Sequence, residues 1–368
     1  MSMHLPHKST GMLLGKFMPP HCGHVYLADF ARHYVSDLTV LVCSLKGDPI
    51  PGELRYQWMR ELLPGSRVVH VTEDLPQTPE EHPEFWPIWR DVVKRHVPGG
   101  IDFVFASEGY GHKLAEVLGA RFIPCDPCRD SVPVSGTAVR EDPLANWRFL
   151  PPCVRPYYVR RVCIFGPEST GKTTLARDLA RHYDTVWVPE HARTLLDCKQ
   201  GRCDLDDIPL IVRGQVASEE ALARQANRVL FCDTDPLTTT IWSRVLFGDC
   251  PEWIDELAQQ RRYDLYLLLD VDVPWIDDSQ RHLPHKRREF LGQCEGLLKS
   301  KSPPESLRRK RRRSTRDAAR AEHNRQSSSR KMYPPQNTPS SPHRRVHSPT
   351  KHRRAAPIPL RRLKSPHQ

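Results

Sequence analysis

Short apolar runs alternate with longer helix-like stretches over the first 150 residues of the chain. Each apolar run has the length of a buried strand. Two of the intervening stretches, residues 52–63 and 111–118, space their apolar residues as amphipathic helices do. This alternation is typical of a parallel sheet with crossover helices. We therefore expect an α/β domain over residues 11–155, with strands in the runs MLLGKF, LTVLVCSL, SRVVHVT, IDFVFASE and ARFIPCD.

The same rhythm restarts after a seam marked by prolines, FLPPCVRPYY. A second α/β domain is expected over residues 160–298, with strands in RRVCIFG, TVWVPE, RVLFCDTD and YDLYLLLDVD. The longest apolar runs of the chain are strand-sized and far shorter than the roughly 20 residues that cross a bilayer. We therefore expect no membrane segment.

The net charge of +11 in 368 residues is concentrated at one end of the chain. Residues 291–368 contain 21 Lys and Arg against 4 Asp and Glu, whereas residues 1–290 contain 34 against 40. The basic segment is rich in Pro, Ser and Arg and poor in branched apolar residues, which predicts a disordered tail over residues 299–368. Its arginines also permit an alternative function, the non-specific binding of nucleic acid through phosphate contacts.

Cysteine usage bears on the compartment of the protein. Eleven cysteines are scattered along the chain without the spacing of a disulfide scaffold, and no apolar signal segment precedes Met12. These features predict a cytoplasmic protein with reduced thiols. Cys125 and Cys128 form a lone C-x-x-C, which is a weak indication of a metal site.

The strongest motif of the second domain is G-x-x-x-x-G-K-T at residues 166–173, between the strand RVCIF and the helix-like TTLARDLARHY. Its glycines let backbone N–H groups surround a phosphate, and the N-terminus of the following helix adds positive charge. Lys172 is expected to reach the β- and γ-phosphate oxygens, and Thr173 to offer its hydroxyl to Mg²⁺. The sequence therefore predicts a nucleoside triphosphate site formed by Gly166, Ser169, Thr170, Gly171, Lys172, Thr173 and Thr174.

Carboxylates follow two further strands of this domain, at the sheet edge where ligands bind in open α/β folds. Glu190 is a candidate base for an acceptor hydroxyl, and Arg193, one helical turn later, is a candidate clamp for phosphate or substrate. Asp233 and Asp235 are candidates for holding a metal ion through water, and Asp235 also for binding substrate. Each carboxylate has the alternative role of capping the helix that follows its strand.

A basic segment follows the last predicted strand of the second domain. Arg281, Lys286, Arg287 and Arg288 are candidates for closing over phosphates, and Trp275 is a candidate stacking platform. A solvated amphipathic helix is the alternative for the basic residues.

In the first domain, the stretch GKFMPPHCGH at residues 15–24 places His21 and His24 between the first strand and a helix-like stretch. A metal site needs three or four ligands, and no second cluster of suitable spacing accompanies these histidines. A core position is unfavourable in a loop rich in Pro and Gly. Imidazoles at a helix N-terminus can instead neutralise a polyphosphate leaving group, so we expect phosphate binding.

Together with Ser135-Gly136-Thr137-Ala138-Val139-Arg140, this stretch resembles the HxGH nucleotidyltransferases, which transfer an adenylyl group from ATP to a phosphate. The HxGH motif also occurs in class I aminoacyl-tRNA synthetases, but the motif from Ser135 to Arg140 favours the nucleotidyltransferases. Joined to a P-loop domain, the arrangement over residues 12–298 is similar to the bifunctional NAD-salvage enzymes of the NadR type. That resemblance implies nicotinamide mononucleotide adenylyltransferase and ribosylnicotinamide kinase activities, with ATP and Mg²⁺ as cofactors.

The resemblance also implies roles for particular residues and a set of partners. The implied catalytic residues are His21, His24, Arg140, Lys172, Glu190 and Asp233. The implied ATP-binding residues outside the P-loop are Gly15, Lys16, Phe17, Ser135 and Thr137, and the implied substrate-binding residues are Arg55, Trp58 and Trp275. From the residues alone, Arg281 stays a candidate for binding ATP, and Arg193 and Asp235 stay candidates for binding substrate. Nicotinamide mononucleotide, nicotinamide riboside and ATP are the expected partners, in a homo-oligomer. A different acceptor for the first domain, such as nicotinate mononucleotide or pantetheine phosphate, is the alternative.

The chain departs from the NadR type at both ends. It reaches its first strand by Met12, so we do not expect the helix-turn-helix module of the repressor members in this sequence. The resemblance stops at about residue 298, whereas the family continues through another strand and a closing helix. We hypothesise that a frameshift replaced this part of the kinase domain, which would expose an edge of its sheet.

Overall fold

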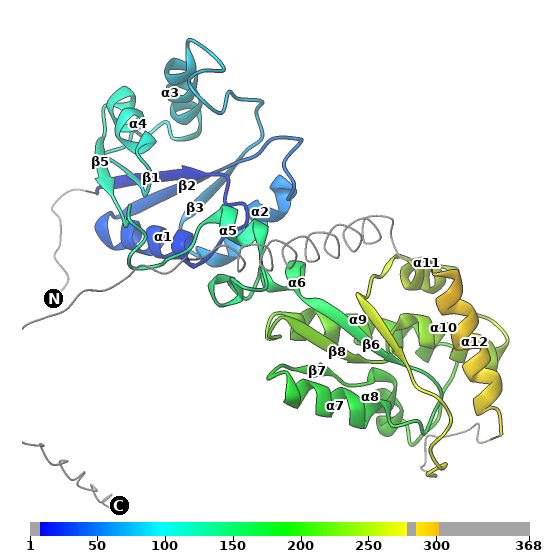
Figure 1. Cartoon of the computed structure of the whole chain (residues 1–368). Coiled ribbons are helices and arrows are strands. Elements are labelled where there is room, and N and C mark those ends of the chain that lie inside the picture. Colours follow the sequence, from blue (N-terminus) through cyan, green and yellow to red (C-terminus); the bar gives the residue numbers. More distant parts are fainter. Residues whose placement is uncertain (1–7, 278–284, 302–368) are drawn as a thin grey trace, which may run out of the picture. The chain divides into compact units, whose positions relative to one another are not determined.

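The computed structural model describes residues 8–277 and 285–301, and these residues form two parallel sheets with helices on both faces (Figure 1). The predicted α/β fold class is confirmed for both halves of this region. All eleven cysteines are free thiols in this structure. Within the described residues, no helix combines the length and apolar character that crossing a bilayer requires.

The first sheet has five strands in the order β3-β2-β1-β4-β5, and every neighbouring pair is parallel. The chain therefore moves outward from β1 to β3 and then returns to the other side of β1. This reversal creates a crevice at the carboxyl ends of β1 and β4, where open α/β sheets bind ligands. The strands are β1 (Thr10–Gly15), β2 (Asp37–Cys43), β3 (Arg67–Val71), β4 (Phe103–Ala106) and β5 (Arg121–Pro124).

Alternating residues of the central strand enter two separate cores, as expected of a strand that is covered on both faces. Leu13 packs with residues of α1 and α2, and Met12 packs with residues of α3 and α4. The helices predicted over residues 52–63 and 111–118 are confirmed as α2 and α4. The helical elements of this half are α1 (Cys22–Tyr34), α2 (Gly52–Leu62), α3 (Phe85–His96), α4 (Tyr110–Leu118), α5 (Gly136–Glu141), η1 (Trp147–Phe149) and α6 (Arg155–Tyr158).

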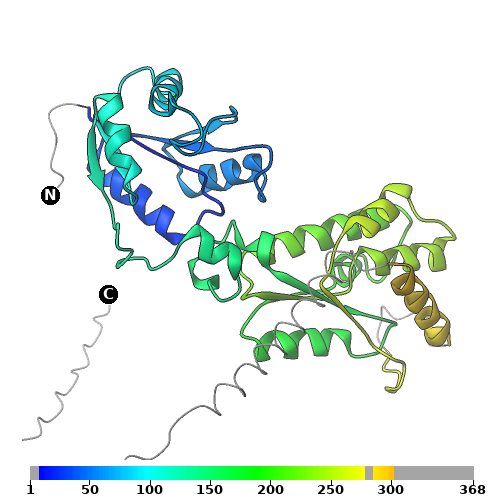
Figure 2. The same ribbon diagram turned by 45° about the horizontal axis from the view of Figure 1, so that its top comes forward.

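The second sheet has four parallel strands in the order β7-β8-β6-β9. One face of the sheet packs on α7, and the other face packs on α10, α11 and α12. Figure 2 shows α7 on one side of the sheet and the other three helices on the opposite side. The strands are β6 (Arg160–Phe165), β7 (Trp187–Val188), β8 (Val229–Asp233) and β9 (Leu265–Leu268). The helices are α7 (Lys172–His182), α8 (His191–Cys198), α9 (Asp207–Ala223), α10 (Pro236–Phe247), α11 (Glu252–Gln260) and α12 (Arg287–Ser300).

The far end of the second half differs in detail from the expectation. In the described part of the chain β9 is an edge strand, and its first residue, Leu265, is 50% exposed. Helix α12 covers the sheet through Phe290 and Cys294 and continues past residue 299, where the tail was expected to begin. The remainder of the predicted tail, residues 302–368, lies outside the described residues.

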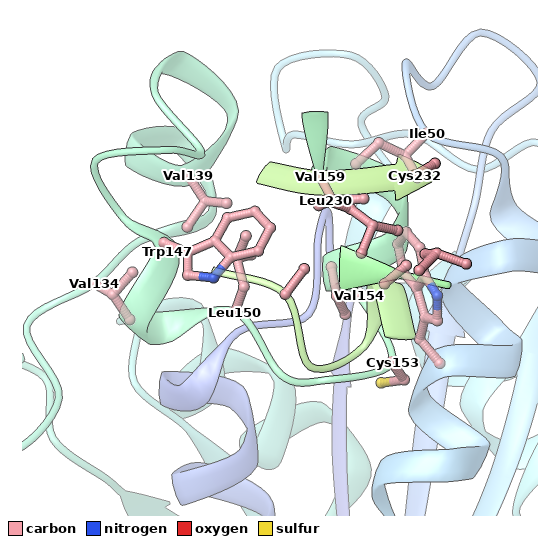
Figure 3. Close-up of a cluster of buried hydrophobic side chains, with 14 residues drawn as sticks. Ile50, Val134, Val139, Trp147, Leu150, Cys153, Val154, Val159, Leu230 and Cys232 are labelled. Carbon is pink, nitrogen blue, oxygen red and sulfur yellow. The ribbon is translucent and has the colours of Figure 1, made fainter. Parts of the chain in front are cut away.

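The proline-rich seam between the two sheets is packed rather than exposed. Figure 3 shows Leu150 and Val154 of this seam gathered with Trp147, which precedes the seam, and with Leu230 and Cys232 of β8. Leu150 and Val154 are buried almost completely, with 1% and 0% of their surface exposed. The seam therefore forms part of a hydrophobic core.

Candidate functional site

The two histidines of the first half lie where the sequence predicted, on the loop that opens α1 at the carboxyl end of β1. His21 is the residue that precedes α1, and its backbone N–H donates to Nδ1 of His24 at 3.3 Å. The two imidazole rings are stacked, with their centroids 3.7 Å apart. Because Nδ1 of His24 accepts this hydrogen bond, the proton of the neutral ring lies on Nε2. His24 therefore offers an Nε2–H donor.

Burial makes both rings neutral near pH 7. Burial, with a contribution from the nearby Arg129 guanidinium, lowers the pKa of His21 to about 4. Burial also lowers the pKa of His24 well below its usual value, and His21 and Arg129 add to this effect. The neutral imidazoles thus supply hydrogen-bond donors and no positive charge. Any positive charge at this site comes from neighbouring cations. Nδ1 of His21 is buried without a partner among the described residues, which marks it as a group that a ligand can satisfy.

A cavity of about 130 Å³ adjoins these histidines and is lined by Gly15, Phe17, His21, His24, Glu108 and Arg129, among others. Arg129 is a cation that the sequence analysis missed. The Asp126 carboxylate accepts backbone N–H groups of Asp130, Ser131 and Val132 at 2.8 to 3.2 Å, and this turn carries Arg129 toward the histidines. The one available signal was its place in the loop after β5, the strand next to β4.

The motif from Ser135 to Arg140 joins the same loop but differs from the expectation in detail. Ser135 caps α5, because its hydroxyl accepts the N–H of Ala138 at 3.1 Å. Arg140 donates to the hydroxyl of Thr137 at 3.0 Å and to the carbonyl of Met18 in the loop after β1. Arg140 is exposed and free to meet an anion, whereas the Ser135 hydroxyl is already engaged.

Arg55 and Trp58 were predicted to bind substrate, and the structure corrects both. Arg55 is fully buried, and its guanidinium donates to the carboxylate of Asp48 at 2.6 Å and to the carbonyls of Ile50 and Cys43. A further donor bond reaches the carbonyl of Lys16. Arg55 therefore supports the loop after β1 from behind. Trp58 is 6% exposed and belongs to the hydrophobic cluster of Figure 3.

Replacing Arg55 by methionine should lower the free energy of unfolding by about 3–5 kcal/mol, because it leaves the Asp48 carboxylate buried without its main partner. Asp48 is 5% exposed at its side chain, and its remaining cation is Lys16 at 3.3 Å. Thermal unfolding measures the loss. Arg60→Met on the exposed side of α2 is the matched control, and equal effects of the two substitutions would contradict a structural role for the buried pair.

In the second half, the P-loop takes the conformation that its glycines predict. Gly166 and Gly171 have φ values of 136° and 84°, in the region that favours glycine. A side chain at Gly166 would also lie 2.9 Å from the carbonyl of Leu269. Lys172, the first residue of α7, donates to the carbonyl of Pro167 across the loop at 2.7 Å. The motif and its strand and helix context are thus confirmed.

Two residues predicted to hold a metal ion come together at this loop. The Thr173 hydroxyl donates to Oδ2 of Asp233 at 2.5 Å, and Asp233 is fully buried at the end of β8. Its second oxygen, Oδ1, is buried without a partner among the described residues. A hydroxyl and a half-satisfied carboxylate beside a phosphate-binding loop match the oxygen ligands that Mg²⁺ prefers.

Glu190 lies beside this pair of residues. It precedes α8, and its side chain makes no capping bond to the helix, so the alternative role is excluded for its carboxylate. Burial raises the pKa of Glu190; Lys172 opposes this shift and Asp233 adds to it. Arg193 is 3.8 Å from the carboxylate. The arrangement holds a carboxylate of raised pKa near the P-loop lysine.

Asp235 has the capping role that was the alternative for it. Its Oδ1 accepts the backbone N–H and the hydroxyl of Thr238 at 2.9 and 3.1 Å, and its Oδ2 accepts the Tyr266 hydroxyl at 2.8 Å. Asp235 is 1% exposed and sits at the start of α10. These bonds engage both oxygens of the buried carboxylate from within the protein, which corrects the prediction that it binds substrate or metal.

The basic segment after β9 is described in part. Arg281 lies outside the described residues. Arg287 begins α12, donates to the carbonyl of Ser169 in the P-loop at 2.9 Å, and lies 5.8 Å from the ring centroid of Trp275. The helix alternative is therefore correct for residues 287–300, but Arg287 still contacts the P-loop.

A cavity of about 160 Å³ extends from the P-loop to the helices that follow β7 and β8. Its polar end is formed by P-loop residues with Glu190 and Arg193, and its apolar walls include Leu196, Ile208, Ile211, Trp242 and Leu246. Trp275 does not line it. The residues of these walls could not be identified from the sequence, because they belong to α8, α9 and α10, whose apolar positions resemble those of ordinary core helices.

Comparison with known proteins confirms the predicted resemblance. Residues 161–303 match a family described as AAA domain. The trifunctional NAD biosynthesis/regulator protein NadR of Escherichia coli (strain K12) is 29% identical over 307 residues, which cover 77% of this chain and 74% of the relative. NadR of Salmonella typhimurium (strain LT2) is 28% identical over 315 residues, which cover 79% of this chain and 77% of the relative.

Solved structures agree on the fold. A crystal structure of NadR protein in complex with NR has a TM-score of 0.67 at 22% identity, over 80% of this chain and 86% of that chain. A second structure, of NadR protein in complex with NAD and AMP-PNP, has a TM-score of 0.63 at 22% identity, over 80% and 88%. The similarity extends over both halves of the described region, since neither half alone accounts for this coverage.

Proposed function

We propose that this NadR-like chain is a bifunctional enzyme of NAD biosynthesis, which forms NAD in its first half and phosphorylates nicotinamide riboside in its second. One observation carries the proposal. A loop that carries two histidines at the start of α1 and a P-loop beside a buried carboxylate occur in one chain that resembles NadR over 77% of its length. The free thiols further support a cytoplasmic location.

In the first half, we infer that the 5′-phosphate of nicotinamide mononucleotide attacks the α-phosphorus of ATP. The bond to the bridging oxygen breaks, and pyrophosphate leaves with the electron pair. The Nε2–H of His24 and the N-terminus of α1 are placed to stabilise the charge that develops on the phosphates. Arg129 and Arg140 supply positive charge, and Lys16 is held nearby by Asp48.

In the second half, the 5′-hydroxyl of nicotinamide riboside attacks the γ-phosphorus of ATP, and ADP leaves. Glu190, whose pKa is raised by burial, is suited to accept the hydroxyl proton. Lys172 is placed to bind the β- and γ-phosphate oxygens. Thr173 and Asp233 would hold Mg²⁺, which neutralises phosphate charge when bound.

The proposal is tested by incubating the full chain with ATP, Mg²⁺ and either nicotinamide mononucleotide or nicotinamide riboside, with chromatographic detection of products. We expect NAD from the mononucleotide, and the mononucleotide followed by NAD from the riboside. Nicotinate mononucleotide and pantetheine phosphate in parallel reactions test the alternative acceptors. NAD formation without phosphorylation of the riboside would restrict the activity to the first half, and no product in either reaction would overturn the proposal.

A further inference from the structure

We propose that Gln215 is a specificity-determining residue of the kinase reaction, which donates a hydrogen bond from its side-chain amide to an oxygen of the acceptor nucleoside. This inference rests on the proposed function of the second half. It concerns a residue of α9 that carries no recognisable motif and that lines the cavity beyond the P-loop.

The amide of Gln215 has a defined orientation. Its Oε1 accepts the backbone N–H of His191 at 2.9 Å, so Nε2 is the group left over. Nε2 is buried and has no hydrogen-bond partner among the described residues, and Gln215 is only 2% exposed. Because an unpaired buried donor is costly, a native structure normally satisfies it with a ligand or a bound water. Gln215 is one of the residues that line the cavity beyond the P-loop, so a ligand bound there is a candidate partner for Nε2.

Gln215 is a polar residue on a face of α9 whose neighbouring residues at the cavity are apolar. Ile208 and Ile211 precede it at helical spacing, and both line the same cavity with apolar surface. The neighbouring Gly214 lets α9 approach closely, since a Cβ atom there would lie 2.0 Å from the His191 ring. This close approach brings the Gln215 side chain to the backbone of His191.

The position of Gln215 relates it to the reaction. His191 directly follows Glu190, the candidate base, so the fixed end of the Gln215 amide lies one residue from the carboxylate that meets the acceptor hydroxyl. The apolar walls formed by Leu196, Trp242 and Leu246 fit the flat ring of a nucleoside. A donor at this place requires an acceptor oxygen on the ligand, and nicotinamide riboside offers such oxygens on its ribose hydroxyls and on its ring carboxamide.

The closing experiment measures binding of nicotinamide riboside to the full chain by calorimetry, and its phosphorylation at varied riboside concentration. Gln215→Glu keeps the oxygen that accepts the His191 N–H but replaces the donor by an acceptor. We expect about 10- to 100-fold weaker binding and a matching rise in KM, because an unpaired polar group costs about 1–3 kcal/mol. KM for ATP and adenylyl transfer in the first half should stay unchanged.

Two further variants guard the interpretation. Gln225→Glu makes the same chemical change at an exposed position just beyond α9, and should have no effect. Gln215→Met removes the donor without adding charge, and it should also weaken riboside binding. It serves as the test variant if Gln215→Glu does not fold. Three analogues identify the substrate oxygen that accepts the hydrogen bond: ribosides without the 2′- or the 3′-hydroxyl, and a riboside with a methyl group in place of the carboxamide. The analogue that lacks this oxygen should bind the unmodified chain and Gln215→Glu with equal affinity.

The outcomes separate the two proposals. If the unmodified chain binds no riboside, the kinase function fails and this inference fails with it. If the unmodified chain binds riboside and the Gln215 variants bind it with the same affinity, the kinase function stands and this inference is wrong. The ratio of the two affinities, for the unmodified chain and for Gln215→Glu, should disappear with one analogue. If this ratio is the same for every analogue, the inference is wrong, because no substrate oxygen would then accept a hydrogen bond from the amide.

Discussion

Replacing Lys172 by alanine is expected to lower the rate of riboside phosphorylation by about 10²- to 10³-fold, the usual cost of removing a donor that stabilises transition-state charge. Lys172 begins α7 and crosses the P-loop, where its ammonium group is placed for the β- and γ-phosphate oxygens. The residue also opposes the burial-induced rise in the pKa of Glu190, so its removal perturbs the candidate base as well. Initial rates at saturating ATP and riboside measure the effect.

The two-site organisation supplies the internal control for this variant. Adenylyl transfer to nicotinamide mononucleotide by the same preparation should be unchanged, which shows that the protein is folded. Lys299→Ala, on the exposed side of α12, removes a lysine from the same half and should leave both activities intact. A Lys172→Ala protein that still phosphorylates the riboside at the normal rate would rule out phosphoryl transfer at this P-loop.

Replacing His24 by alanine is expected to produce the converse result, a loss of about 10²- to 10³-fold in adenylyl transfer with phosphorylation unchanged. The tautomer set by the N–H of His21 directs the proton of His24 to Nε2, and the buried neutral ring retains that donor near pH 7. Because the donor stabilises developing charge, the loss should appear in kcat more than in KM for ATP. NAD formation from the mononucleotide measures it.

A histidine elsewhere on α1 provides the comparison. His33→Ala removes an exposed imidazole near the end of the same helix and should leave NAD formation unchanged. His24 also stacks on His21, so thermal unfolding of the His24 variant should accompany the kinetics. Retention of full adenylyl transfer in a folded His24→Ala protein would contradict the role of the histidine loop.

Several features of the two sites could be predicted from local sequence. The P-loop spacing requires glycines at positions of positive φ and a lysine at the start of a helix, so the motif determines the geometry of residues 166–173. The loop of His21 and His24 follows the same logic, because a strand, a Pro-rich turn and a helix-like stretch place both residues at a helix N-terminus. Each of these arrangements depends on contacts between residues close in sequence.

Other residues received their roles from distant partners. Residues of the same type have different roles. Asp233 accepts a hydrogen bond from Thr173 at the P-loop, whereas Asp235, two residues later, accepts hydrogen bonds from Thr238 and Tyr266. Arg55 was taken from the sequence as a substrate ligand, but its charge is paired with Asp48 behind the loop. No pattern of single residues distinguishes these cases, because a carboxylate or guanidinium is equally compatible with capping, ion pairing and ligand binding.

The sequence by itself determined two parallel α/β halves, the succession of their strands along the chain, and the places of the histidine loop and the P-loop, because hydrophobic periodicity and glycine positions act over short stretches of chain. Only the tertiary structure decided which polar groups face a cavity with unused hydrogen-bonding capacity. Gln215 shows the reason. Helix α9 packs against the start of α8, so that Oε1 of Gln215 accepts the N–H of His191, 24 residues earlier, while Nε2 is left without a hydrogen-bond partner among the described residues. Burial and partner choice are properties of the packed chain.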